Sequence, residues 1–119
     1  MTTITFKFKV PMLNGSAGLI RSHFHVQKKQ KEKILCEILA QTNARYKGKV
    51  RVALTRYSVI EPDIDNLCAS FKHIGDMLVK SKVITDDKPS VIAEFIPKWE
   101  KAKNNSEQKT VITIEEIVE

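Results

Sequence analysis

The residues best suited to chemistry in this sequence are aspartates in its central third. Asp63 and Asp65 are separated by one residue, and Pro62 disfavours helix just before them. In an extended backbone, residues i and i+2 point to the same side, so we expect these two carboxylates to converge while Ile64 points into the core. Two adjacent carboxylates repel each other unless a cation neutralises them. Mg²⁺ accepts one or two carboxylates together with water and phosphate oxygens, so the pair indicates a magnesium site.

The same residues also have a purely structural interpretation, because a bare Asp-x-Asp is common in turns, helix caps and solvated loops. A second acidic pair, Asp86-Asp87, follows a predicted helix that carries Lys72 and Asp76. On the structural interpretation, Lys72 forms an exposed i,i+4 ion pair with Asp76. The functional interpretation therefore depends on the wider pattern and not on the first pair alone.

This wider pattern resembles the RusA family of Holliday junction resolvases. The core of that family reads roughly Asp-x-Asp-Asn, then a helix bearing Lys and an Asp four residues later, then an apolar pair before Asp-Asp. The corresponding residues here are Asp63, Asp65, Asn66, Lys72, Asp76, Asp86 and Asp87. The N-terminal part is similar too, with an opening strand, Pro11, a loop containing Asn14, and residues 20–24 leading into a Lys-rich helix. The resemblance covers most of the chain and is most specific in the central third.

The resemblance implies a magnesium-dependent endodeoxyribonuclease that resolves four-way (Holliday) junctions in DNA recombination and repair. It implies that Asp63, Asp65 and Asp87 bind Mg²⁺ and that Lys72 assists catalysis. Asp86 either acts on the metal through water or caps its own turn. The family also implies a homodimer, which suits the paired nicks that an approximately two-fold symmetric junction requires.

One position departs from the family pattern. Shorter members place the lysine one helical turn after the second Asp of Asp-x-Asp, where this chain has Ala69. Lys72 follows Asp65 by nearly two helical turns, so the two residues would still share one helix face. The Lys72–Asp76 spacing matches the family, and we therefore interpret the difference as an insertion in the first turns of the helix.

The elements that must position these residues follow from the hydrophobic pattern. Alternation of apolar and polar residues predicts strands over residues 4–10, 50–57, 91–97 and 111–118. Helical spacing predicts helices over 26–42 and from an N-cap at Asp65 to 79, with Leu67, Phe71, Ile74 and Leu78 as the buried stripe of the second. Residues 101–107 are expected to form an exposed hairpin loop. The order β-α-β-α-β-β predicts a single α+β domain over residues 1–119, with a small mixed sheet and two α-helices.

The charge of the chain favours a polyanionic partner. Twenty Lys and Arg against 14 Asp and Glu give a formal net charge of +6, which does not distinguish DNA from RNA or an anionic membrane surface. Lysines crowd the start of the first predicted helix, where they oppose the helix dipole and where a phosphate would relieve their repulsion. The residues expected to contact nucleic acid are Arg21, His23, Lys28, Lys29 and Lys31.

Other features limit the alternatives. No apolar run approaches the ~20 residues of a membrane span, and the N-terminus alternates where a signal peptide would be continuously apolar. We therefore expect a cytoplasmic protein whose Cys36 and Cys68 are reduced thiols, Cys68 being packed. Trp99 is expected to anchor the late strand. Two other functions stay open, a non-catalytic nucleic-acid-binding protein with the same fold and a small basic RNA-binding protein whose acids are surface caps.

Overall fold

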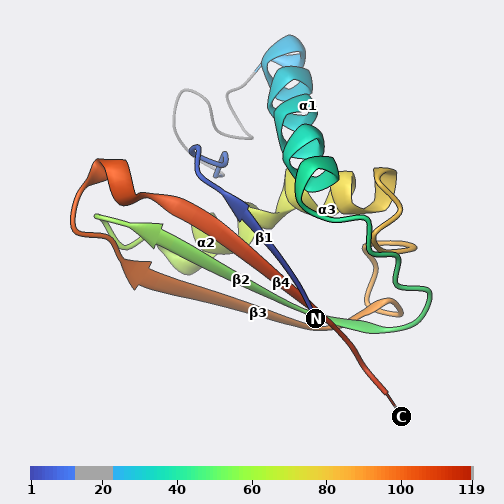
Figure 1. Ribbon diagram of the computed structural model, residues 1–119. Helices are drawn as coiled ribbons and strands as arrows, with labels where there is room; N and C mark the ends of the chain where they lie inside the picture. Colours follow the sequence, from blue (N-terminus) through green and yellow to red (C-terminus); the bar gives the residue numbers. More distant parts are fainter. Residues whose placement is uncertain (13–22, 119) are drawn as a thin grey trace.

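A four-stranded mixed sheet forms the centre of the computed structural model, which describes residues 1–12 and 23–118 (Figure 1). The strands are β1 (Thr2–Phe6), β2 (Val50–Ser58), β3 (Ile92–Lys101) and β4 (Lys109–Glu116). Their order across the sheet is β1-β4-β2-β3. Strand β4 is antiparallel to both β1 and β2, whereas β3 runs parallel to β2. The helices are α1 (Phe24–Gln41), α2 (Ile64–Ala69) and α3 (Phe71–Lys80).

The hydrophobic core lies between one face of this sheet and the helices. Successive strand residues point to opposite faces, so every second residue of β2 is buried and the residues between them are half-buried. The helices contribute their apolar stripes to the same cluster. Its central members are Val52 and Leu54 of β2, Ile112 and Ile114 of β4, Ile34 and Ile38 of α1, Leu67 of α2, and Ile74 and Leu78 of α3. The predicted stripe of the second helix is thus observed, with Phe71 packed against its edge.

The predicted α+β class and the order β-α-β-α-β-β are confirmed, but some details differ. Strand β1 ends at Phe6, and β3 continues through Pro97 to Lys101. Proline is tolerated there because β3 is an edge strand, where its missing N–H can face away from the ladder. The expected hairpin between the last two strands is wrong, because β2 lies between β3 and β4. The connection between them contains a short 3-10 turn, η1 (Asn105–Glu107).

The predicted second helix is present as two consecutive helices that divide at Ser70. The Ser70 hydroxyl lies 3.3 Å from the Asn66 carbonyl oxygen, one turn earlier, and accepts a hydrogen bond of 2.8 Å from Arg56 Nη1. A serine hydroxyl bound to the carbonyl four residues earlier competes with the helix ladder and bends the helix. The division falls between Asp65 and Lys72, in the stretch where the sequence suggests an insertion relative to the RusA pattern. No helix in the described part of the chain combines the length and apolarity that a membrane span requires.

Candidate functional site

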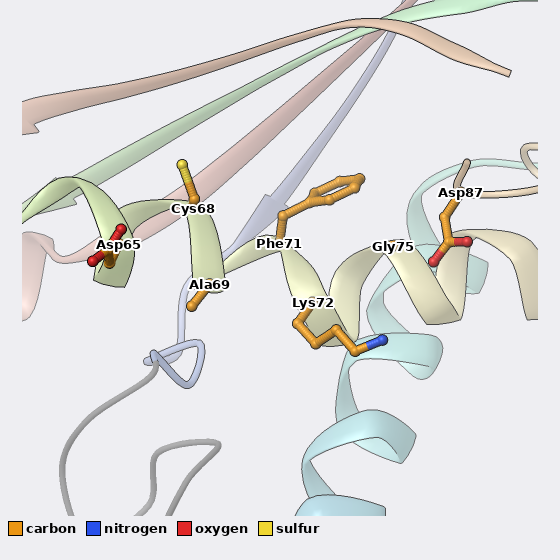
Figure 2. A pocket seen from close by; sticks show the side chains of 7 residues that line it. All are labelled: Asp65, Cys68, Ala69, Phe71, Lys72, Gly75 and Asp87. Carbon is orange, nitrogen blue, oxygen red and sulfur yellow. The ribbon is translucent and has the colours of Figure 1, made fainter. Parts of the chain in front are cut away.

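An open pocket along α2 and α3 brings together three of the residues expected to act in catalysis. Asp65, Lys72 and Asp87 line this pocket of about 510 Å³, together with Cys68, Ala69, Phe71 and Gly75. In Figure 2, Asp65 and Asp87 stand at opposite ends of the pocket and the side chain of Lys72 lies between them. Asp65 and Lys72 therefore line one pocket, although the helix divides between them and the Lys72 side chain extends away from Asp65 (Figure 2).

Asp63 has a different position, because it is the N-cap of α2. Its Oδ1 accepts a hydrogen bond of 2.9 Å from the backbone N–H of Asn66. Such a cap satisfies one of the N–H groups that the first helical turn leaves without a partner. The helix therefore starts at Ile64, and the prediction that Asp65 would be its cap is wrong.

The expected convergence of Asp63 and Asp65 in an extended segment is also wrong. Asp63 has an extended backbone, with φ −69° and ψ 168°, whereas Asp65 already belongs to the first helical turn. The i, i+2 alternation of a strand consequently does not apply to the pair. The residue between them, Ile64, is 64% exposed instead of pointing into the core.

The two residues of the second acidic pair, Asp86 and Asp87, also have different positions. Asp87 lines the pocket, whereas Asp86 stabilises the turn. Asp86 Oδ1 accepts a hydrogen bond of 2.8 Å from the backbone N–H of Asp87, and Asp86 Oδ2 lies 3.5 Å from Lys88 Nζ. The hydrogen bond from the Asp87 amide is the main reason that the pKa of the Asp86 carboxyl is below its ordinary value. Of the two, Asp87 is the residue that lines the pocket with Asp65.

Asp65 and Asp87 are the side chains of this pocket that could hold a cation. Their hard carboxylate oxygens suit Mg²⁺, which commonly takes one or two carboxylates and completes its shell with water and phosphate oxygens. Across residues 1–12 and 23–118, no three His, Cys, Asp or Glu side chains are grouped closely enough to hold a metal ion. The set of Asp63, Asp65 and Asp87 is therefore not brought together as a three-carboxylate site. Asp65 and Asp87 stand at opposite ends of the pocket and do not converge on one position in this structure (Figure 2).

Lys72 belongs to the pocket and also forms the ion pair that the structural interpretation expected. Its Nζ lies 3.4 Å from Asp76 Oδ1, while Lys31 Nζ from α1 lies 3.4 Å from Asp76 Oδ2. Each oxygen of Asp76 thus faces one lysine. The Lys72 side chain is 61% exposed, and exposed pairs of this kind contribute only ~0–1 kcal/mol. A phosphate oxygen could therefore compete with Asp76 for the Lys72 ammonium.

His73 of α3 interacts electrostatically with Lys31, Asp76 and Lys72, and the sequence pattern did not predict a role for it. It is 3% exposed, and neither of its ring nitrogens has a hydrogen-bond partner in the described structure. Burial is the main cause that lowers the pKa of His73, and the positive charge of Lys31 lowers it further, partly opposed by Asp76. Position 73 lies next to the apolar stripe of the helix, and the sequence there does not indicate whether a histidine is buried or exposed.

The residues expected to contact nucleic acid do not form one uniform surface. Arg21 lies outside the described residues. His23 is the N-cap of α1, where its Nδ1 accepts a hydrogen bond of 3.3 Å from the His25 N–H. Lys29 is exposed, and Lys28 and Lys31 line a groove of about 300 Å³ between α1 and α3. The lysines therefore project to more than one side of α1, and Lys31 is already paired with Asp76.

Two further predictions concern single side chains. Cys36 and Cys68 are both free, as expected, but Cys68 is exposed in the pocket and not packed in the core. Trp99 does anchor β3, because its ring packs against the core and its Nε1 donates a hydrogen bond of 2.9 Å to Ser58 Oγ on β2.

A comparison with protein-family models and a comparison with curated proteins both find no match to this chain.

Proposed function

We propose that this protein is a divalent-metal-dependent endonuclease acting on branched DNA, with the pocket along α2 and α3 as its active site. The observation that carries the proposal is the shared pocket of Asp65, Lys72 and Asp87, which unites two carboxylates and an ammonium from α2, α3 and the loop before β3. This combination suits phosphodiester hydrolysis, in which negative charge grows on the phosphate oxygens.

Each residue has a distinct part in the proposed reaction. Asp65 and Asp87, at opposite ends of the pocket, would each supply a carboxylate to Mg²⁺, which would polarise the phosphate and lower the pKa of a water molecule. Asp63 is proposed as a further ligand on the RusA resemblance alone. It lies outside the pocket lining and caps α2 through Oδ1, and this hydrogen bond does not use Oδ2. Lys72 leaves Asp76 to bind a phosphate oxygen and stabilises the charge that develops there. Asp86 acts as a positioning residue, because it holds the backbone of Asp87.

The proposed substrate is a four-way junction, and the proposed setting is DNA recombination and repair in the cytoplasm. A formal net charge of +6 supports a polyanionic substrate. A homodimer is proposed because paired nicks in a two-fold symmetric junction require two active sites. The choice of a branched substrate and of a dimer rests on the RusA resemblance.

The test uses synthetic four-way junctions, with nicking measured in Mg²⁺ and binding measured without a divalent cation. We expect Asp65→Asn and Asp87→Asn each to abolish nicking and to leave binding intact, because removal of negative charge does not hinder DNA approach. Asp86→Asn is the matched control, since an Asn oxygen still accepts the Asp87 N–H and the residue lies outside the pocket lining. Full nicking by either pocket variant would remove the proposed metal site.

The variant Asp63→Asn distinguishes the role of Asp63 as a helix cap from its proposed role as a metal ligand. Asparagine caps helices about as well as aspartate, so α2 and the melting temperature should be unchanged. We expect nicking to be lost, because the amide is a much weaker metal ligand than the carboxylate. Retained nicking would restrict Asp63 to its role as the cap.

The second candidate function is a nucleic-acid-binding protein without nuclease activity. The observation that favours it is the position of Asp63 outside the lining of the pocket that holds Asp65 and Asp87. This alternative predicts that the wild-type protein binds junctions without nicking them in Mg²⁺ or Mn²⁺.

A further inference from the structure

Arg56 on β2 is a buried cation whose observed partners are neutral. The residue is 4% exposed, and its Nη1 donates hydrogen bonds to the Val10 carbonyl oxygen at 3.1 Å and to Ser70 Oγ at 2.8 Å. No carboxylate pairs with Arg56 within the described residues, and segment 13–22 contains no Asp or Glu in its sequence. Desolvation lowers the pKa of Arg56, but an arginine stays protonated in proteins. A buried charge without an opposite charge is costly, which indicates that an anion completes this site.

Arg51, in the same strand, shows the ordinary arrangement. Its guanidinium donates two hydrogen bonds to the Glu94 carboxylate, at 2.7 and 3.2 Å, and one to the Glu115 carboxylate, at 3.2 Å. Both carboxylates raise the pKa of Arg51, with the Glu94 hydrogen bond as the largest cause. The strand therefore carries one arginine neutralised by carboxylates and one, Arg56, that has no carboxylate partner among residues 1–12 and 23–118.

Arg56 lines a pocket of about 480 Å³, a size within the usual range of ligand sites. The charged residues of its lining are Lys9 and Arg56, and no acidic side chain is among the described residues that line it. Asn66, Asn105 and Gln108 add amide groups to the wall. Gln108 Nε2 donates a hydrogen bond of 2.8 Å to Asn105 Oδ1, which orients these two amides. The wall thus combines two positive charges with hydrogen-bonding groups, as an anion requires.

The surroundings favour a polyanion over a small anion. A neighbouring hollow shares Gln108 with the Arg56 pocket and is lined by Lys7, Lys101 and Lys109, with Glu107 as its acidic residue. Short helix α2 connects the Arg56 pocket to the candidate active site, because Asp65 lines the active-site pocket and Asn66 lines the Arg56 pocket. A nucleic acid backbone that crosses α2 could therefore place one phosphate in each pocket.

We propose that the Arg56 pocket binds a backbone phosphate of the nucleic acid substrate, at a position other than the phosphate that is cleaved. The guanidinium suits this role because it can bind phosphate through two parallel N–H groups. In the described structure both hydrogen bonds of Arg56 come from Nη1, so Nε and Nη2 can bind the ligand. The identity of the polyanion rests on the proposed function, whereas the anion site rests on Arg56 and its pocket.

The first measurement uses inorganic phosphate as the probe and does not involve DNA. We expect the melting temperature of the wild-type protein to rise in phosphate relative to chloride at equal ionic strength, because a ligand that binds the native state stabilises it. Arg56→Met should lose this rise. Arg51→Met, the matched control in the same strand, should keep it. Equal responses of wild type and a folded Arg56→Met would overturn the anion site.

The second measurement is the affinity for a four-way junction without divalent cations, as a function of salt concentration. Arg56→Met should bind more weakly than wild type and reduce the slope of log affinity against log salt by about one unit for the lost contact. Lys9→Gln tests the same pocket at an exposed rim residue, so it remains informative if Arg56→Met does not fold. Unchanged affinity and slope in Lys9→Gln and in folded Arg56→Met would overturn the proposal, even if phosphate stabilises the protein.

The two proposals can fail separately. A wild-type protein that shows both Arg56-dependent responses but does not nick DNA retains this site and loses the nuclease function. A wild-type protein that nicks junctions, with Arg56 and Lys9 variants that bind normally, retains the nuclease function and loses this site.

Discussion

Lys72 illustrates how one exposed side chain can have a structural partner and a chemical role together. It pairs with Asp76 at 3.4 Å and lines the pocket that contains Asp65 and Asp87. We expect Lys72→Ala to reduce junction nicking by roughly a hundredfold or more, because loss of one donor to a developing oxyanion typically costs ~3 kcal/mol. Stability should change by only ~0.2–0.5 kcal/mol, the usual contribution of an exposed i,i+4 pair.

The rate and the melting temperature should be measured on the same Lys72 variant. Lys80→Ala is a suitable control, because Lys80 is an exposed lysine in the last turn of α3 and lies outside the lining of this pocket. A normal rate for Lys72→Ala and a reduced rate for Lys80→Ala would transfer the catalytic role to the end of α3.

His73 predicts a loss of stability at mildly acidic pH. Its folded-state pKa is below the ordinary value of 6.5, so the unfolded chain binds the proton more readily. The stabilising effect of the neutral imidazole is therefore complete above about pH 6.5 and is lost as the pH falls below that value. Urea unfolding at pH 7.5 and pH 5 should show this decrease, and His73→Leu should remove most of it.

Measurements between pH 5 and 6.5 distinguish the protonation of His73 from that of carboxylates, which ordinarily titrate near pH 4. His25→Leu is the control, because His25 is exposed at the start of α1. An equal pH dependence in wild type and His73→Leu would assign the acid sensitivity to other groups.

At the scale of an element, the C-terminus of α3 contains a strained residue. Lys82 has φ 66°, a left-handed conformation that favours glycine, and its N–H bonds the Val79 carbonyl at 3.0 Å. The Val83 N–H bonds the Leu78 carbonyl at 3.0 Å, so the two bonds form a Schellman motif with Lys82 at the position that glycine usually occupies.

We predict that Lys82→Gly stabilises the protein. Removal of the side chain relieves the ~1–2 kcal/mol cost of a left-handed L-residue, while the added freedom of the unfolded chain offsets ~0.4–1 kcal/mol of this gain. The net increase in unfolding free energy should be about 0.5–1 kcal/mol, measured by urea unfolding. Lys80→Gly, inside the helix, should have the opposite sign. A decrease in stability for Lys82→Gly would indicate that the Lys82 side chain makes a favourable contact.

At the scale of the whole molecule, the positive charge is distributed over several surfaces, and its parts should contribute unequally to DNA binding. Lys28→Ala should reduce the salt dependence of junction binding by about one unit if Lys28 contacts a phosphate. Lys31→Ala should have a smaller effect, because Asp76 already neutralises Lys31 at 3.4 Å. Binding isotherms between about 50 and 200 mM salt would test this difference. A larger effect for Lys31 would mean that DNA displaces Asp76 from it.

Much of the fold could be predicted from the sequence, because the pattern of apolar residues is local. Alternation in β2 and helical spacing in α3 reflect which face of each element is buried, and this requires no knowledge of its neighbours. The order of elements then determined the α+β class. For the candidate site, the motif pattern selected Asp65, Lys72 and Asp87, which the structure brings to one pocket.

Tertiary structure decided what depends on contacts between distant residues. Strand β4 pairs between β1 and β2, a choice that no local pattern encodes. The helix divides at Ser70, whose hydroxyl bonds Arg56 on β2 as well as the Asn66 carbonyl. Asp63 caps α2 because the helix begins two residues earlier than its pattern indicated. Burial of Arg56 and His73 likewise depends on how whole elements pack against each other. Arginine is mostly exposed in proteins and histidine is often partly exposed, so their own segments do not predict this burial.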